Sequence, residues 1–185
     1  LGRTGEESDV KSFAIAAIGA AALAAIPAEA SASEIFGGVF VHGVDTPLSL
    51  GGDPEDGLDV QLGWRGDRIG RTPLQPYVFG ALNTAGDTSY AAVGLSAKFG
   101  DRVYVRPGLG LAVHTGSAER FDDPFNEEIE FGSRILFAPE IAIGVRVAPR
   151  VTAEASLVHL SHGTLFSGQN PGIDTVGIRV NVELP

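Results

Sequence analysis

The sequence predicts an all-β protein, an eight-stranded antiparallel transmembrane β-barrel of the outer-membrane type. From residue 34 onward, apolar and polar or small residues alternate with a period of two, and clusters of Gly, Pro, Asn and Asp interrupt the alternation. The longer segments run for roughly 10 to 14 residues, which matches a tilted strand that crosses a bilayer rather than a soluble strand of about 5 or 6. Their number is even, as a small outer-membrane barrel requires.

The alternating segments define the predicted strands, and none of them shows convincing helical periodicity. The strands are expected at 35–43, 58–66, 74–83, 88–99, 102–114, 132–147, 150–162 and 173–184. The turns at 100–101 and 148–149 are tight, whereas the connections 44–57, 115–131 and 163–172 are long. If the N-terminus lies in the periplasm, the three long connections lie outside the cell.

The segment 134–147 gives the clearest indication of which face of the predicted strands points into the lumen and which meets lipid. One face carries Arg134, Glu140 and Arg146 among small residues. In a soluble sandwich that face would meet water, but the strand length and the mixture of charge signs favour a narrow lumen in which Gly and Ala make room for Arg and Glu. The opposite face is apolar and is expected to meet lipid: Ile135, Phe137, Pro139, Ile141, Ile143, Val145 and Val147.

Composition excludes several classes of protein. With 185 residues, 44% of them hydrophobic, the chain is long enough for one domain or one small barrel. The net charge of −10 argues against a nucleic-acid partner, and the lack of cysteine excludes disulfides, thiolate metal sites and cysteine nucleophiles. No cofactor is indicated. The acidic residues of the long loops are expected to be solvated surface rather than a metal site: Asp53, Glu55, Asp56, Asp122, Asp123, Glu127, Glu128 and Glu130.

The first segment is predicted to be a targeting signal. Residues 12–26 are uncharged and mostly Ala, Ile, Leu and Phe, and the segment is shorter than the roughly 20 residues that a spanning helix needs. A buried Ala-rich helix is the alternative. Cleavage sites are offered by the small residues Ala28, Ala30 and Ala32. The expected organisation is a signal peptide with its upstream residues at 1–30 and the barrel at 31–185.

A histidine, a serine and a carboxylate lie near the two last strand ends, and together they are the parts of an activated nucleophile. Residues two apart in a strand share a face, so His159 and Ser161 continue the apolar, outward face of 150–162. Asp174 shares its parity with the outward residues of 173–184. A solvated polar rim is the structural alternative.

The expected strand directions place these three residues near the extracellular end. Strand 150–162 runs outward and strand 173–184 returns, so His159, Ser161 and Asp174 are predicted to face lipid at the depth of the outer leaflet. Polar groups there are costly, which favours a functional role. The other carboxylates nearby, Glu154 and Glu183, have lumen parity. Structural positions are expected for the remaining histidines, with His42 and His114 at strand ends and His162 directed to the lumen.

Three segments carry a resemblance to a known family. They are the run 131–147 with its opening Phe-Gly-Ser-Arg, the His-Leu-Ser-His of 159–162, and the Asn-Pro-Gly-Ile-Asp of 170–174. These segments resemble the PagL-type lipid A deacylases, also called the acyloxyacyl hydrolase family. The resemblance covers roughly the last third of the chain in motif and the whole mature chain in strand pattern.

The resemblance implies an outer-membrane esterase that hydrolyses an ester-linked acyl chain of lipid A within lipopolysaccharide. His159 would be the general base, Ser161 the nucleophile and Asp174 the orienting carboxylate. The family acid is usually Glu, and the residue after the serine is often Asn, so backbone N–H groups near His162 and Gly163 would hold the oxyanion here. The alternative is a non-catalytic barrel, a structural protein or an adhesin. Whether the barrel forms a homodimer is left open.

Overall fold

The computed structural model describes residues 32–48, 55–119, 129–163 and 171–185. The predicted signal peptide lies outside these residues. The described strands are β1 (Glu34–Val41), β2 (Leu58–Arg65), β3 (Leu74–Asn83), β4 (Tyr90–Ala97), β5 (Phe99–Gly100), β6 (Val103–His114), β7 (Ile135–Ala148), β8 (Val151–Leu160) and β9 (Ile173–Glu183). Within the described part of the chain, no helix is long and apolar enough to cross a membrane.

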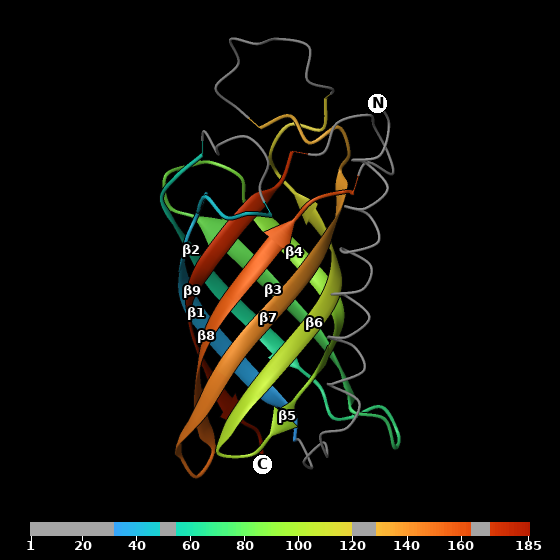
Figure 1. The fold of residues 1–185 in the computed structure, drawn as a ribbon, viewed down its shortest axis with the longest axis vertical. Coiled ribbons are helices and arrows are strands. Elements are labelled where there is room, and N and C mark those ends of the chain that lie inside the picture. The colour runs from blue at the N-terminus through green and yellow to red at the C-terminus, as the bar shows by residue number, and fades with distance from the viewer. Residues whose placement is uncertain (1–31, 49–54, 120–128, 164–170) are drawn as a thin grey trace, which may run out of the picture.

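The strands form one closed antiparallel barrel, which confirms the predicted fold class. Most neighbours in sequence are neighbours in the sheet, β1 pairs with β9, and β4 pairs with β6 to complete the circle. The two-residue β5 also pairs with β6, so β4 and β5 occupy one strand position, interrupted at Lys98. Figure 1 shows tilted strands, with the tight turns and the C-terminus at one end and the described parts of the three long connections at the other.

Two strands begin two or three residues later than the alternation predicts. The strand expected at 132–147 begins at Ile135, because the N–H groups of Phe131 and Gly132 donate to the carbonyls of Ser117 and Glu119 instead of a neighbouring strand. The strand expected at 88–99 begins at Tyr90. Each error lies at a strand end, where loop hydrogen bonds replace the sheet.

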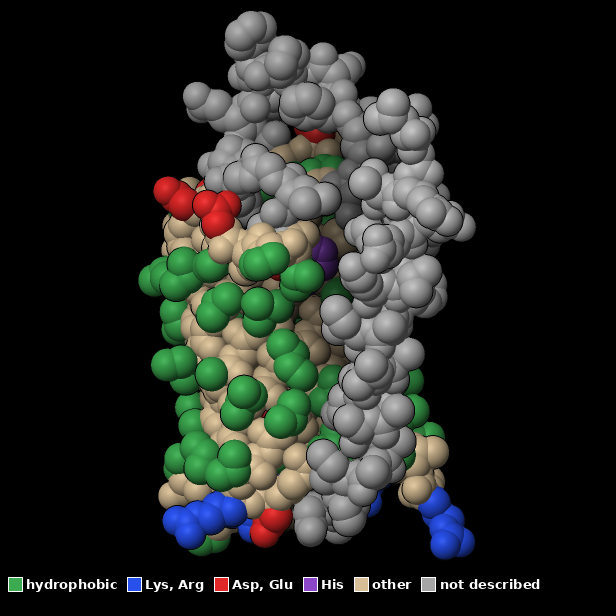
Figure 2. Space-filling model, in the orientation of Figure 1, with side chains coloured by type: hydrophobic (Ala, Val, Ile, Leu, Met, Phe, Trp, Pro, Cys, Tyr) green, Lys and Arg blue, Asp and Glu red, His purple; other side chains and the backbone are tan. Residues whose placement is uncertain are grey.

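The outer wall is apolar, as predicted. Leu62, Ile143 and Ile178 are 68%, 60% and 66% exposed, and every long strand except β8 contributes exposed large apolar side chains. Figure 2 shows hydrophobic side chains spread over the wall and basic side chains gathered at the end with the tight turns. An apolar band bounded by charge is the surface that a bilayer requires of a barrel.

A network of ion pairs fills the lumen. Glu34 accepts from both Arg65 and Arg106, while Arg179 Nη2 donates to Glu140 Oε2 at 3.1 Å. Arg106 Nε lies 3.3 Å from an oxygen of Glu154. The side chains of all three arginines are fully buried, and their charges match those of the three glutamates. The lumen is therefore a packed, charge-balanced core, and the polar face points inward as the sequence predicted.

Candidate active site

The ends of β8 and β9 carry the candidate site. The antiparallel register of these strands places His159 directly opposite Asp174. Ser161 follows β8 and forms an isolated bridge with Phe137 of β7, with N–H to carbonyl distances of 3.1 and 2.7 Å in the two directions. Ser161 is therefore fixed by β7, while its side chain stays on the face of the sheet that carries His159.

The three predicted residues lie in hydrogen-bond contact. His159 Nδ1 lies 2.7 Å from Asp174 Oδ1, and His159 Nε2 lies 2.8 Å from Ser161 Oγ. In the tautomer that carries its proton on Nδ1, the histidine donates to the carboxylate and accepts from the serine hydroxyl. This arrangement allows the imidazole to take the hydroxyl proton while the carboxylate stabilises the resulting cation.

The structure corrects the expected environment of Asp174. The sequence predicted a lipid-facing carboxylate, but the Asp174 side chain is fully buried, and the His159 side chain is 12% exposed. The segment 42–48 packs over Asp174: Val44 N–H donates to its carbonyl at 2.9 Å, and the hydroxyl of Thr46 donates to its Oδ2. The parity argument missed this contact because strand alternation says nothing about a loop that folds back over the sheet.

A glycine lets the chain that enters β9 approach the imidazole. A Cβ atom on Gly172 would lie 2.9 Å from His159 Cε1 and 2.9 Å from the carbonyl oxygen of Leu160. Any larger residue would displace the imidazole or the strand end. Gly172 belongs to the Asn-Pro-Gly segment that the sequence singled out, and Asn170 lies outside the described residues.

The predicted oxyanion donors follow Ser161 directly in the chain. His162 is fully buried, and Gly163 has a φ of +60°, a left-handed conformation that turns the backbone out of the strand direction. The N–H of Ser161 itself donates to Phe137, so it is already engaged. The role of His162 and Gly163 as donors remains a prediction.

A second histidine lies at the same end of the barrel, at the mouth of the lumen. His42 is fully buried between two carboxylates, with Nδ1 2.9 Å from Asp59 Oδ1 and Nε2 3.1 Å from Glu55 Oε2. Burial alone would lower the pKa of His42, but the hydrogen bonds and charges of Asp59 and Glu55 outweigh it and raise the pKa to about 9. We call His42, Glu55 and Asp59 the His42 cluster.

Two of the acidic loop residues expected to be solvated are buried instead. Glu55 is 7% exposed and accepts from the backbone N–H and the hydroxyl of Thr88, each at 2.9 Å. Burial raises the pKa of the Glu55 carboxyl, yet the hydrogen bonds from His42 and Thr88 prevail and the pKa is lowered. Glu130 is 5% exposed, whereas Asp56 is exposed. The others lie outside the described residues: Asp53, Asp122, Asp123, Glu127 and Glu128.

His114 is a structural residue at the end of β6. Its Nε2–H donates to the carbonyl of Ser133 at 2.8 Å, and its ring packs against Phe131 with 4.4 Å between ring centroids. Its imidazole thus fastens the long connection before β7 to the rim. The expectation of a structural position at a strand end is met.

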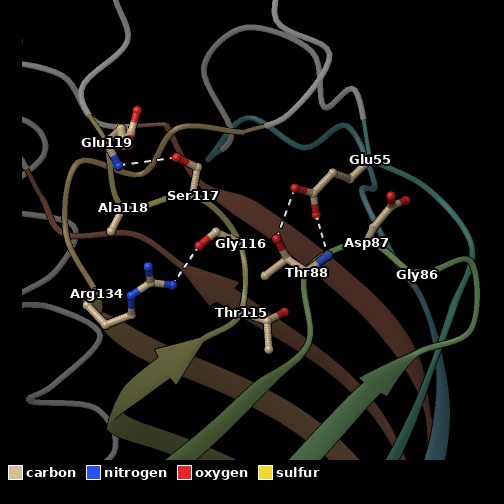
Figure 3. A pocket seen from close by; sticks show the side chains of 10 residues that line it. All are labelled: Glu55, Gly86, Asp87, Thr88, Thr115, Gly116, Ser117, Ala118, Glu119 and Arg134. Carbon is tan, nitrogen blue, oxygen red and sulfur yellow. Dashed lines mark hydrogen bonds between the residues drawn. The ribbon is translucent and has the colours of Figure 1, made fainter.

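A polar cavity of about 520 Å³ opens at the rim near Glu55. Figure 3 shows Thr88 bonded to Glu55 on one side and Arg134 donating to the carbonyl of Gly116 on the other. The triad residues do not line it. In the part of the chain that the structure describes, no three His, Cys, Asp or Glu side chains are grouped to hold a metal ion.

Fold and site together define a class: a small barrel of the outer-membrane type with a serine, a histidine and an aspartate in contact at one end of its wall. The model of the lipid A 3-O-deacylase (PagL) family matches residues 53–183. The chain belongs to this family, which confirms the resemblance seen in the sequence. Fold and family indicate the bacterial outer membrane as its location.

Comparison with solved structures supports the fold. The crystal structure of the outer membrane enzyme PagL is 19% identical, covers 82% of this chain and 99% of its own, and gives a TM-score of 0.54. The crystal structure of Neisserial surface protein A is 17% identical, covers 84% of this chain and 99% of its own, and gives a TM-score of 0.54. A de novo designed transmembrane β-barrel is 13% identical, covers 85% of this chain and 100% of its own, and gives a TM-score of 0.52. A search of curated protein sequences finds no match.

Proposed function

We propose that this protein is an outer-membrane esterase that hydrolyses the 3-O-linked acyl chain of lipid A. The observation that carries the proposal is the pair of hydrogen bonds made by His159, at 2.7 Å to Asp174 and 2.8 Å to Ser161. Membership of the lipid A 3-O-deacylase family supplies the substrate. A base that is oriented on one side and touches a hydroxyl on the other is the arrangement that activates a serine.

The proposed reaction has two halves. Ser161 Oγ attacks the ester carbonyl as His159 Nε2 takes its proton, and Asp174 stabilises the imidazolium that forms. The tetrahedral oxyanion collapses, the sugar hydroxyl leaves with the proton from His159, and the acyl group stays on the serine. Water then attacks the acyl ester with His159 as base, which releases the fatty acid and restores the serine. Backbone N–H groups near His162 and Gly163 would hold the oxyanion.

The surroundings of the site suit an insoluble substrate. Ile141 and Val176, which lie on either side of Leu157 in the sheet, are 42% and 38% exposed on the outer wall. An acyl chain attached to an ester at Ser161 could lie along this apolar wall within the bilayer. Because the long connections lie at the same end as the site, we place the reaction in the outer leaflet, where lipid A resides (Figure 1).

Two measurements test the proposal. Mass spectrometry determines the lipid A of cells that express the chain, and an assay in solution measures ester hydrolysis by the purified barrel. We expect loss of one acyl chain with the parent and none with Ser161→Ala. Ser156→Ala is the matched control, because Ser156 lies on the same strand but is buried on the lumen side, and its replacement should leave hydrolysis unchanged.

The second candidate is a non-catalytic barrel. The fold shared with Neisserial surface protein A allows it, but the family match supports the esterase more strongly. This candidate gains support if lipid A mass is unchanged and the folded, purified protein hydrolyses no acyl ester. Equal hydrolysis by parent and Ser161→Ala would instead retain an enzyme but reject the proposed nucleophile.

A further inference from the structure

The carboxylate of Asp174 is buried on all sides, so both of its oxygens need hydrogen-bond donors from the protein. Its side chain has no exposed surface, and His159 serves Oδ1 alone. A buried carboxylate oxygen without a donor is strongly unfavourable. The donor to Oδ2 is the hydroxyl of Thr46, which lies 128 residues away in the sequence.

The direction of the Thr46 hydroxyl proton follows from its contacts with Leu48 and Asp174. The N–H of Leu48 donates to Thr46 Oγ1 at 3.1 Å, which occupies a lone pair of that oxygen. An ionised carboxylate can only accept, so the hydroxyl proton must point at Asp174. Turning the Thr46 hydroxyl away from Asp174 would therefore also break its hydrogen bond with the Leu48 N–H.

The segment that carries Thr46 is anchored at two points. At its start, His42 N–H donates to the carbonyl of Gly57 at 3.0 Å, and the His42 side chain is bound by Asp59 and Glu55. Further along, Val44 N–H donates to the carbonyl of Asp174 at 2.9 Å. Thr46 is thus held against the carboxylate by the barrel itself.

We propose that Thr46 is a positioning residue of this hydrolase, which holds the Asp174 carboxylate with Oδ1 directed at His159. The proposal rests on the proposed function, since it assigns Thr46 a part in the same site. With His159 on one carboxylate oxygen and Thr46 on the other, the rotation of the Asp174 carboxylate is fixed from both sides. Thr46 acts through Asp174 and takes no proton from the substrate.

The experiment measures lipid A ester hydrolysis by the full-length barrel purified in detergent. Thr46→Val keeps the shape of the side chain but removes the hydroxyl, and we expect kcat to fall about 10- to 100-fold with KM within about twofold, the loss expected for a hydrogen bond to a charged group. Thr46→Ser restores the hydroxyl and should stay within about threefold of the parent. The proposal is overturned if kcat is unchanged in Thr46→Val. It is also overturned if Thr46→Val and Thr46→Ser lose kcat equally.

The matched control is Thr84→Val. Thr84 is exposed at the same end of the barrel, and its hydroxyl accepts from Leu58 N–H at 3.2 Å, so it shares the backbone contact but not the carboxylate. Its replacement should leave kcat unchanged. If Thr46→Val does not fold, as judged by heat-modifiability, Thr46→Ala is compared with Thr46→Ser, and equal kcat in that pair overturns the proposal.

A double-mutant cycle separates positioning from a general structural role. In an Asp174→Asn background, Thr46→Val should cause no further loss, because its effect passes through the carboxylate. The same loss in both backgrounds overturns the proposal. An inactive parent rejects the proposed function and this inference together, whereas a fully active Ser161→Ala retains an enzyme but rejects the proposed nucleophile and this inference. An active parent with an inactive Ser161→Ala and an unaffected Thr46→Val rejects this inference alone.

Discussion

Two histidines lie at the same end of this barrel, and each contacts a buried aspartate, yet only one is arranged as a base. His159 lies on the wall with Asp174 on one ring nitrogen and the Ser161 hydroxyl on the other. His42 lies at the mouth of the lumen with Asp59 on one nitrogen and Glu55 on the other. The two sites differ in the partner of the second nitrogen.

That partner decides what each imidazole can do. Two carboxylates require two N–H donors, so His42 is held in its protonated form and its pKa is raised to about 9. It has no lone pair with which to take a proton at neutral pH. At His159 the second nitrogen meets a hydroxyl, which can donate, so the ring can serve as an acceptor. A histidine beside an aspartate is therefore not by itself evidence for catalysis.

The largest expected difference between the two histidines is in turnover. We expect His159→Ala to reduce lipid A ester hydrolysis by several orders of magnitude without unfolding the barrel. The reason is that removing one member of a cooperating catalytic set costs about as much rate as removing the whole set. His42→Ala, assayed where the barrel is folded, should stay within about tenfold of the parent. The measurement is the hydrolysis rate of each purified variant, with heat-modifiability as the folding control. A greater loss from His42→Ala would reverse the assignment.

The next largest effect concerns the acid. Asp174→Asn should keep the fold but lose much of the rate, by analogy with the roughly 10⁴-fold loss in the serine-protease example. Asp174→Glu should retain measurable activity. Glu154→Gln and Glu183→Gln should change stability more than turnover, and Glu154 is indeed buried in the lumen beside Arg106. A folded Asp174→Asn with full activity would reduce the site to a His159 and Ser161 dyad.

In stability the order of the two histidines should reverse. His42→Ala leaves Asp59 and Glu55 buried without their shared cation, and removing one partner of a buried pair costs about 3–5 kcal/mol. His159 is partly exposed, so His159→Ala should be the milder of the two. Urea unfolding of the barrel in lipid vesicles measures both. Equal midpoints for the two variants would show that the His42 cluster contributes no more than the triad.

The smallest effect is a pH dependence of stability. Because the folded pKa of His42, about 9, lies above its ordinary value of 6.5, its contribution is fully present below about pH 6.5 and is lost as pH rises through 9. The urea midpoint of the parent should fall over this window, and that of His42→Ala should fall less. The pKa of Glu55 is lowered, so its contribution is present above pH 4.5 and is lost as pH falls below it. Parallel curves for parent and variant between pH 6.5 and 9 would contradict this assignment.

The sequence by itself determined the barrel and the outward parity of the candidate site. Strand alternation has a period of two, so the faces of Leu157, His159 and Ser161 follow from local geometry without knowledge of any neighbour. The same rule directed Glu140, Glu154 and Arg179 inward, where the structure places them. Resemblance to the family rested on short segments and was confirmed by the match over residues 53–183.

Only the tertiary structure decided the contacts between loops and strands. Alternation predicted Asp174 on the lipid-facing side, but the segment 42–48 covers it and supplies the hydroxyl of Thr46. The acidic character of the long loops predicted a solvated Glu55, which instead binds His42 at the mouth of the lumen. Loop residues carry no periodicity, and their partners lie on strands far away in the sequence. Which side chains meet there depends on the closure of the whole barrel, a long-range property that a local pattern does not encode.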